Sequence, residues 1–326
     1  MMQKLISVEG LAVRFFTRKG TVRAVDGVSF DVDDGGIVGL VGESGCGKSA
    51  TALSIMGLLG PAGETTSGSV RFKGEDLLRL SPKEMRQIRG KEISMVFQEP
   101  MSALNPVRSV GEQVAEPLKI HLGLSGGEAR LRAIEMLEEV GIPDAASRYD
   151  QYPHQFSGGM GQRAMIAMAL ICEPKLLIAD EPTTALDVTI QAQIISLLHS
   201  LRERLHMAVL LITHDFGVVA ELCDVVNVMY AGVIVEWGNV VDVFDDPLHP
   251  YTRGLLRSMP RAKRRQRKLE VIGGAVPSLI ELPQGCRFHP RCKCVMERCF
   301  SEEPPIFQLN DDRLVRCWLF EGRMKL

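Results

Sequence analysis

The chain has 326 residues, 45% of them hydrophobic, and a formal net charge of −2 at pH 7. This length indicates about two domains, the apolar fraction indicates a globular protein with a real core, and the small net charge favours neither nucleic acid nor anionic lipid as a partner. Because no apolar run approaches the roughly 18 residues of a membrane span and residues 1–10 lack the pattern of a signal peptide, we expect a cytosolic chain that reaches a membrane only by binding another protein.

The N-terminal part of the chain has the pattern of an antiparallel β layer. Short apolar runs fill residues 5–32, and residues 17–20 have the composition of a hairpin turn. Phe15 or Phe16 could stack on a nucleotide base from such a layer. For either residue alone, however, burial in the core is the simpler explanation.

A glycine-rich segment after this layer matches the phosphate-binding pattern G-x-x-x-x-G-K-[ST]. It reads Gly42-Glu-Ser-Gly-Cys-Gly-Lys-Ser49, follows an apolar run at residues 37–41 and precedes a helical pattern at residues 50–59. This order of strand, loop and helix favours a nucleotide site over an ordinary glycine turn, because loop N–H groups and the helix N-terminus converge on one anion. Lys48 is expected to reach the β- and γ-phosphates, and the Ser49 hydroxyl is expected to hold Mg²⁺.

Two further strands, at residues 70–73 and 93–97, are predicted on either side of a helix that starts at Ser81-Pro82. Gln98 follows the second strand, where its amide could contact Mg²⁺ or the attacking water. Taken alone, such a glutamine is more often an ordinary loop amide.

Residues 110–172 have a helical texture. Within them, Ser157-Gly-Gly-Met-Gly161 precedes a helical run and offers a second anion site at a helix N-terminus. The signal is weak by itself, since Ser-Gly-Gly is common in loops.

A buried strand is predicted at residues 176–180, ending in Asp180 and followed at once by Glu181. Carboxylates placed in this way hold Mg²⁺ and act as general base in P-loop ATPases, whereas the alternative is a pair of solvated carboxylates in a turn. His214 stands at the tip of the next predicted strand, where it could reach a γ-phosphate, although a lone histidine is usually structural. The remaining elements are a helix at residues 189–205 and strands at residues 209–212, 225–229 and 233–237.

The C-terminal region differs in composition from the rest of the chain. Residues 261–268 form a basic run that is better explained as a solvated linker than as a lipid-binding segment. Five of the eight cysteines lie in the last 41 residues. In a cytosolic protein such a cluster indicates metal or redox chemistry before disulfides.

Together, and in this order, the motifs resemble those of the ATPase subunit of an ABC transporter. Residues 42–49 resemble its Walker A motif, Gln98 its Q-loop, residues 157–161 its signature, and residues 176–181 its Walker B strand with the catalytic glutamate. Ala185-Leu-Asp187 is similar to the D-loop and His214 to the switch histidine. The resemblance covers residues 1–250.

Four segments narrow the resemblance to the dipeptide/oligopeptide importer branch and its D-type ATPase subunit. They are residues 97–106, 152–160, 178–187 and 249–252, and the cysteine-containing tail is similar to that branch's C-terminal extension. The chain departs from the branch at Gly161, where an arginine is usual, and at Cys294, which is an additional thiol.

The resemblance implies an α/β fold with a P-loop NTPase (RecA-like) core sheet, an antiparallel β layer and an inserted helical subdomain at about residues 99–174. The ATPase domain would span residues 1–250 and the Cys-rich C-terminal extension residues 251–326. The nucleotide contacts that it implies are Gly42, Ser44, Gly45, Cys46, Gly47, Lys48, Ser49, Ala50, Ser157 and Gly159, with no thiol chemistry at Cys46.

In the implied mechanism, two ATPase subunits close head to tail with ATP between them. Glu181 is the general base, while Ser49, Gln98 and Asp180 hold Mg²⁺ and its waters. His214 binds the γ-phosphate, and Lys48 neutralises developing charge. Ser157 and Gly159 would complete the site of the partner subunit.

For the tail, the resemblance implies a [4Fe–4S] cluster held by Cys286, Cys292, Cys299 and Cys317, since such a cluster needs four thiolates. A Cys₄ zinc site and unligated buried cysteines are the alternatives. Which four of the five cysteines bind is left open by Cys294.

The expected partners are a second ATPase subunit (a paralogue rather than a copy), two transmembrane permease subunits and an extracytoplasmic peptide-binding protein, with no nucleic acid. The chain would lie at the cytoplasmic face of the cell (inner) membrane. Another cargo, such as nickel or glutathione, is the first alternative. A soluble ABC ATPase that acts on nucleic acid or ribosomes is the second, but such proteins usually carry tandem ATPase domains or long inserts, which this sequence lacks.

Overall fold

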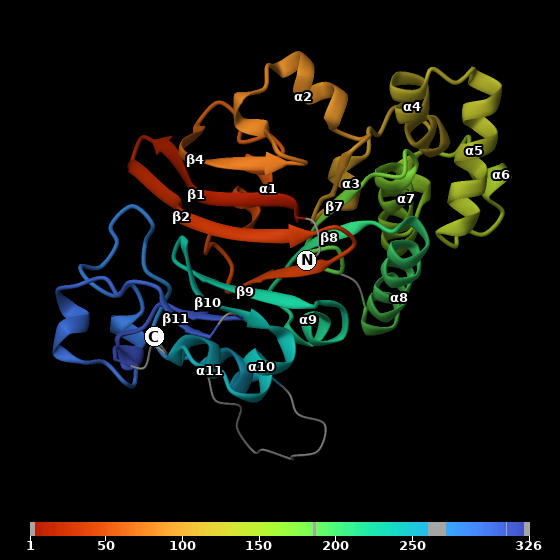
Figure 1. The fold of residues 1–326 in the computed structure, drawn as a ribbon. Helices are drawn as coiled ribbons and strands as arrows, with labels where there is room; N and C mark the ends of the chain where they lie inside the picture. The colour runs from red at the N-terminus through yellow and green to blue at the C-terminus, as the bar shows by residue number, and fades with distance from the viewer. Residues whose placement is uncertain (1–3, 185–186, 260–271, 311, 323–326) are drawn as a thin grey trace. The chain divides into compact units, whose positions relative to one another are not determined.

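The computed structural model describes residues 4–184, 187–259, 272–310 and 312–322 (Figure 1). The chain divides into two compact units. We call residues 1–5, 32–36 and 79–211 the helical unit, and residues 6–31, 37–78 and 212–326 the P-loop unit. The residues after 250 therefore belong to the same unit as the glycine-rich loop, and the domain boundary at residue 250 stays a prediction. The predicted D-loop residues Ala185 and Leu186 and the basic run at 261–268 lie outside the described residues.

The N-terminal layer is an antiparallel sheet, as predicted, with strand order β2-β1-β4-β5. Strand β1 pairs with β4 so that Ile6 lies opposite Phe72 and Val8 opposite Val70. These four side chains are buried, which follows from the alternation of side chains between the two faces of a strand. The strands span Lys4–Thr17 (β1), Gly20–Asp33 (β2), Gly63–Phe72 (β4) and Glu75–Asp76 (β5).

A second sheet of the P-loop unit contains the strands β11-β12-β10-β9-β3, in this order. Strand β3 pairs in parallel with β9, and the other neighbours in this series are antiparallel. The C-terminal extension supplies β11 and β12, so it continues the sheet beyond β10 (Figure 1). The bounds are Ile37–Val41 (β3), Val225–Tyr230 (β9), Val233–Asn239 (β10), Phe307–Asn310 (β11) and Arg313–Val315 (β12).

The helix after the glycine-rich loop is shorter than the sequence predicts. It ends at Ile55, because Gly57 takes a φ of 61° and the Leu58 N–H turns back to donate to the Leu53 carbonyl at 2.7 Å. The helices of this unit are Lys48–Ile55 (α1), Phe216–Leu222 (α9), Val240–Asp245 (α10) and Pro250–Ser258 (α11), with short 3₁₀ turns at His289–Arg291 (η3), Glu297–Phe300 (η4) and Trp318–Phe320 (η5).

The helical unit combines a parallel strand pair with the predicted helices. Strands β6 (Ile93–Val96) and β7 (Leu176–Asp180) run side by side in parallel, and β8 (Ala208–Thr213) begins where the Ala208 N–H donates to the Lys175 carbonyl at 2.9 Å. Serine N-caps start several helices, and Ser125 forms a capping box with Glu128. The helices are Pro82–Ile88 (α2), Pro100–Ala103 (α3), Val110–Leu122 (α4), Gly126–Glu139 (α5), Ala145–Arg148 (α6), Gly158–Leu170 (α7) and Val188–Leu205 (α8), with a 3₁₀ turn at Pro153–Gln155 (η2). Another 3₁₀ turn, Leu77–Arg79 (η1), contains the point in the chain where the P-loop unit gives way to the helical unit.

Within the described ranges, no helix combines the length and the apolar character that a bilayer span requires.

Candidate functional site: a nucleotide loop and a carboxylate pair

The glycine-rich loop joins β3 to α1, as the sequence predicts, and two of its glycines are required by close packing. A Cβ atom at Gly42 would lie 2.2 Å from the Met229 carbonyl oxygen. One at Gly47, whose φ is 113°, would lie 2.2 Å from the Ala24 carbonyl oxygen. No side chain fits at such distances, so the loop backbone can pass here only because these residues are glycines.

Lys48, the first residue of α1, turns its side chain back over the loop. Its Nζ donates to the carbonyl oxygens of Gly42 at 2.7 Å and Glu43 at 3.1 Å, and only 5% of the residue is exposed. The ammonium group is therefore held inside the loop by carbonyl oxygens, which phosphate oxygens can replace. Cys46 is fully buried beside it, and burial raises the pKa of its thiol, so the thiol is neutral and fills space.

The carboxylate pair lies in the helical unit, at the end of β7. Asp180 and Glu181 are 5% and 8% exposed, so they are not the solvated carboxylates of the alternative interpretation. Glu181 has a φ of 48°, in the left-handed region that non-glycine residues rarely occupy. Such strain often accompanies functional positions.

Gln98 contacts Glu181, because β6 and β7 are parallel neighbours whose carboxyl ends lie at the same edge. The Gln98 Nε2 group donates to Glu181 Oε2 at 2.9 Å. The Thr184 hydroxyl donates to the same oxygen at 2.8 Å. Two of the predicted site residues are thus brought together. Thr184 is a contact that the sequence analysis missed, and its position three residues after Glu181 is the only signal for it.

Ser157 caps α7, as predicted, since its Oγ accepts from the Met160 N–H at 3.3 Å. This places Gly158 and Gly159 at the N-terminus of a helix of 13 residues, where the backbone dipoles favour an anion. A Cβ at Gly161 would lie 2.9 Å from the Met101 sulfur. A side chain at position 161 would therefore require the end of the flexible Met101 side chain to shift.

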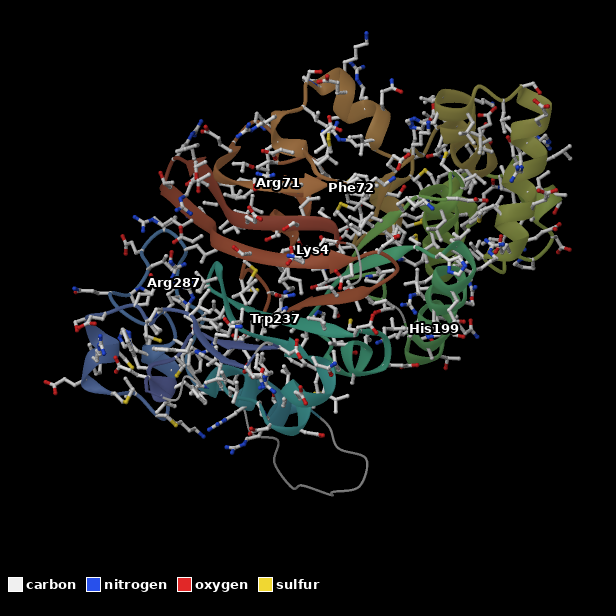
Figure 2. All side chains as sticks on the ribbon, viewed as in Figure 1. Lys4, Arg71, Phe72, His199, Trp237 and Arg287 are labelled. Atoms are coloured by element: carbon white, nitrogen blue, oxygen red, sulfur yellow. The ribbon has the colours of Figure 1, made fainter. Side chains whose placement is uncertain are left out.

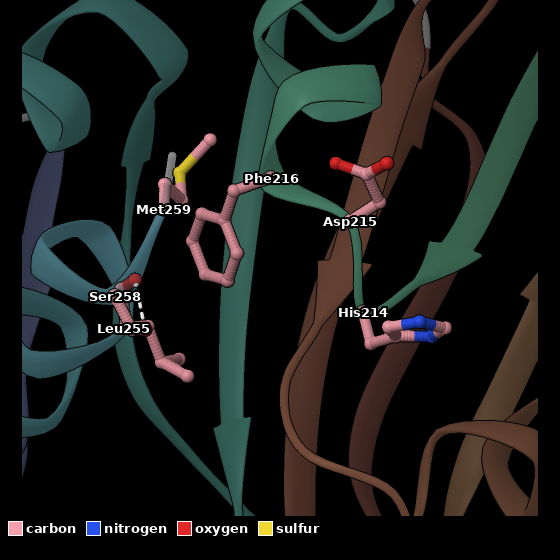
Figure 3. Close-up of a pocket in the computed structure, with 6 residues that line it drawn as sticks. All are labelled: His214, Asp215, Phe216, Leu255, Ser258 and Met259. Carbon is pink, nitrogen blue, oxygen red and sulfur yellow. Dashed lines mark hydrogen bonds between the residues drawn. The ribbon is translucent and has the colours of Figure 1, made fainter. Parts of the chain in front are cut away.

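His214 follows β8 directly and lines a pocket together with Asp215, Phe216, Leu255, Ser258 and Met259. In Figure 3, His214 and Asp215 come from the turn between β8 and α9, Phe216 is the first residue of α9, and the last three side chains come from α11 and its end. The Asp215 carboxylate accepts from the Gly217 N–H at 2.7 Å and caps α9. Asp187, the described residue of the predicted D-loop, caps α8 in the same way through the Ile190 N–H at 2.9 Å.

The predicted ATP-site residues fall into two groups. The loop residues 42–50 and His214 belong to the P-loop unit, whereas Gln98, Ser157, Gly159, Asp180 and Glu181 belong to the helical unit. The predicted Mg²⁺ ligands divide between the groups, with Ser49 in the first and Gln98 and Asp180 in the second. A hydroxyl, an amide and a carboxylate offer the oxygen donors that Mg²⁺ prefers.

The C-terminal cysteines approach one another in a buried part of the P-loop unit. The Cys286 N–H donates to the Cys299 carbonyl at 2.9 Å, and Cys299 and Cys317 are buried, whereas Cys294 is exposed. Burial raises the pKa of the Cys292 thiol to about 11 and that of Cys317 to about 12. These thiols are therefore neutral at physiological pH.

The cysteines do not form the predicted metal site in this structure. Over the described ranges, no three Cys, His, Asp or Glu side chains are arranged so that they could hold one ion. The thiols have the donor chemistry that iron–sulfur clusters and zinc need, but in the described residues they are not gathered into a group that could hold a metal ion. The predicted [4Fe–4S] cluster on Cys286, Cys292, Cys299 and Cys317 is therefore not supported by this geometry.

Two family models match the chain. The model described as ABC transporter matches residues 25–184, and the model described as oligopeptide/dipeptide transporter, C-terminal region, matches residues 235–299. The solved dimeric structure of the ATP-binding cassette MJ0796, in a post-hydrolysis state with ADP and Pi, aligns with a TM-score of 0.65 at 30% identity, covering 72% of this chain and 98% of that one.

Relatives of known type match over nearly the whole chain. The dipeptide transport ATP-binding protein DppD of Bacillus subtilis is 53% identical over 323 residues, covering 99% of this chain and 96% of its own. DppD of Escherichia coli is 50% identical over 313 residues, covering 96% of both chains. The resemblance found in the sequence motifs is thereby confirmed. The chain belongs to the ABC transporter ATPase family, in the branch that carries the oligopeptide/dipeptide transporter C-terminal region.

Proposed function

We propose that this chain is the ATP-hydrolysing subunit that powers import of dipeptides or oligopeptides through an ABC transporter, at the cytoplasmic face of the cell membrane. Two observations carry the proposal: in the P-loop unit a buried Lys48 lies inside the phosphate loop, and in the helical unit a buried Glu181 is held by Gln98. Relatives at 50–53% identity over 96–99% of this chain, named as dipeptide transport ATP-binding proteins, support the cargo class.

The roles follow from the chemistry of each side chain. Lys48 exchanges its carbonyl partners for β- and γ-phosphate oxygens, and His214 contacts the γ-phosphate. Glu181 accepts a proton from the attacking water, and Gln98 orients that water. Ser49, Gln98 and Asp180 would hold Mg²⁺, which neutralises charge on the phosphates when it is bound.

The site is completed by a second ATPase subunit. Ser157 and Gly159 present the N-terminus of α7 as an anion site, and we assign it to the γ-phosphate of the nucleotide bound by the partner. The dimeric form of the MJ0796 cassette supports this arrangement. The second subunit would be a paralogue, and two transmembrane permease subunits and an extracytoplasmic peptide-binding protein would complete the importer.

Thr184 is expected to support Glu181 as general base through the hydrogen bond of its hydroxyl group. Replacing Thr184 by valine removes a hydrogen bond to the Glu181 carboxylate (2.8 Å). Since hydrogen bonds to charged groups contribute about 1.5–3 kcal/mol, hydrolysis should fall about tenfold while ATP affinity stays within about twofold. Steady-state phosphate release and equilibrium ATP binding measure the two effects. Thr184→Ser, which keeps the hydroxyl, is the matched control, and equal losses in the two variants would contradict the assignment.

The [4Fe–4S] cluster that the motif resemblance implies on Cys286, Cys292, Cys299 and Cys317, which the geometry of the tail does not support, is tested by metal analysis. If the cluster is present, iron and acid-labile sulfide should be found at about four atoms each per chain in anaerobically purified protein. Cys294→Ser should keep both, and Cys299→Ser should lose them. Zinc without sulfide would contradict the cluster and favour the Cys₄ zinc alternative.

Uptake in cells tests the transport function. In a strain lacking this gene, the wild-type chain should restore uptake of a radiolabelled dipeptide, and the Glu181→Gln chain should not. Restored uptake of nickel or glutathione, without peptide uptake, would replace the cargo assignment while keeping the importer. No change in the uptake of any of these solutes would contradict the proposal.

A further inference from the structure

The phosphate loop contains an acidic residue, Glu43, at the position after its first glycine. A carboxylate in a loop that binds a polyanion opposes binding by like-charge repulsion. In this structure the carboxylate is paired with Arg291 of the C-terminal extension, 248 residues further along the chain. The pair is bidentate, with Nη1–Oε2 at 2.6 Å and Nη2–Oε1 at 2.9 Å, which is the strong and directional form of this interaction.

Arg291 is fixed in this position by the P-loop unit. Only 4% of its side chain is exposed, against 27% for Glu43. Its Nε donates to the Gly273 carbonyl at 3.0 Å, and its guanidinium lies 5.8 Å from the centre of the Tyr230 ring. The arginine therefore has few other positions available and holds Glu43 at low cost in side-chain entropy.

Tyr251 of α11 holds the backbone of the same loop residue. Its hydroxyl accepts from the Glu43 N–H at 2.9 Å, and the residue is fully buried. The rings of Tyr230, Tyr251 and Phe288 pack with centroid distances of 4.6–5.4 Å. Residues after position 250 thus contact both the side chain and the main chain of Glu43.

Arg287, four residues before Arg291 in the C-terminal extension, contacts residues that lie near the loop. Arg287, labelled in Figure 2, donates to Asp26 at 2.5 Å and to the Ala231 carbonyl at 2.8 Å. Gly232, which follows Ala231 in the chain, donates its N–H to the Cys46 carbonyl of the loop at 2.9 Å. The extension therefore supports the loop at its start through Arg291 and near its end through Arg287.

We propose that Arg291 is a positioning residue of the nucleotide site, which neutralises Glu43 so that the loop presents no negative charge to the ATP phosphates. The C-terminal extension is then a functional part of the ATP site. This inference rests on the assignment of residues 42–49 to ATP binding. Charge neutralisation can be distinguished from a purely structural role of the ion pair. If Arg291 acts by neutralising Glu43, the ATP binding that is lost with Arg291 should return when the charge of Glu43 is also removed.

Equilibrium binding of ATP to variants of the full chain tests the inference. Arg291→Gln is expected to weaken ATP binding about tenfold, or about 1.4 kcal/mol, and the double variant with Glu43→Gln to return within about threefold of wild type. Arg298→Gln is the matched control, since Arg298 also lies in the extension and bonds two carboxylates, Glu302 at 2.7 Å and Glu321 at 2.6 Å. It should bind ATP as wild type does.

Two results would overturn the proposal. One is an Arg291→Gln chain that binds ATP as tightly as Arg298→Gln, and the other is a double variant as weak as Arg291→Gln alone. If the Arg291→Gln chain does not fold, ATP binding to the single variant Glu43→Gln distinguishes the two roles. Charge neutralisation predicts tighter ATP binding in this variant than in the wild type, and a structural role of the ion pair predicts weaker binding. The Lys48→Met variant tests the assignment of residues 42–49 to ATP binding separately. Unchanged ATP binding in that variant would contradict this assignment, whatever the role of Arg291.

Discussion

Replacing Glu181 by glutamine is expected to lower ATP hydrolysis by about 10²- to 10⁴-fold while ATP binding stays nearly unchanged. Glutamine has the size of glutamate, and its carbonyl oxygen can still accept the hydrogen bonds from Gln98 at 2.9 Å and Thr184 at 2.8 Å. The variant therefore keeps the local geometry and loses only the negative charge and the ability to accept a proton. Phosphate release under saturating ATP and equilibrium ATP binding measure the two properties.

The control for this variant is Glu135→Gln, the same exchange at an exposed position of α5. It should hydrolyse ATP at the wild-type rate. If Glu181→Gln retained hydrolysis within about threefold of this control, the loss would be too small for a general base and the assignment of Glu181 would be wrong.

Replacing Lys48 by methionine is expected to weaken ATP binding by about 100-fold, or about 2.7 kcal/mol. The apolar stem of lysine is matched by methionine, so the packing of this residue, which is 5% exposed, is largely kept. What is lost is the ammonium group that donates to the Gly42 and Glu43 carbonyls and would donate to the phosphates. Binding of a fluorescent ATP analogue to the full chain measures the loss.

Lys83→Met, at an exposed position of α2, makes the same exchange outside the nucleotide loop. Thermal unfolding of both variants should show that each is folded. Equal ATP affinity in Lys48→Met and Lys83→Met would contradict the role of Lys48 and would remove the basis for ATP binding by this loop.

Local sequence patterns predicted the parts of the site whose residues are close in sequence. The glycines and Lys48 form one continuous segment with a helix that begins at residue 48, so the pattern can be recognised locally, although the carbonyl groups that leave no room for a Cβ at Gly42 and Gly47 belong to Met229 and Ala24. The contact of Gln98 with Glu181 is long-range, but each residue follows a buried strand. Two such strand ends meet when the strands are parallel neighbours, as β6 and β7 are.

The remaining features depend on pairing between distant segments, which no local pattern encodes. Strands β11 and β12 are short and join the sheet beyond β10, although the tail is rich in cysteine and proline and has little strand pattern. The Arg291–Glu43 pair joins residues 248 positions apart, and an arginine in a tail carries no sequence signal for a partner in the phosphate loop. The helix after that loop ends early because Gly57 adopts a positive φ. The apolar periodicity of residues 50–59 does not indicate this backbone conformation.

The most direct test of the proposed function is purification of the tagged chain from its native membranes in mild detergent, followed by identification of its partners by mass. We expect two multi-span membrane proteins and a second, different ATPase subunit, with peptide-stimulated ATP hydrolysis once the binding protein is added. Recovery of ribosomes or nucleic-acid-binding proteins without a membrane partner would contradict it.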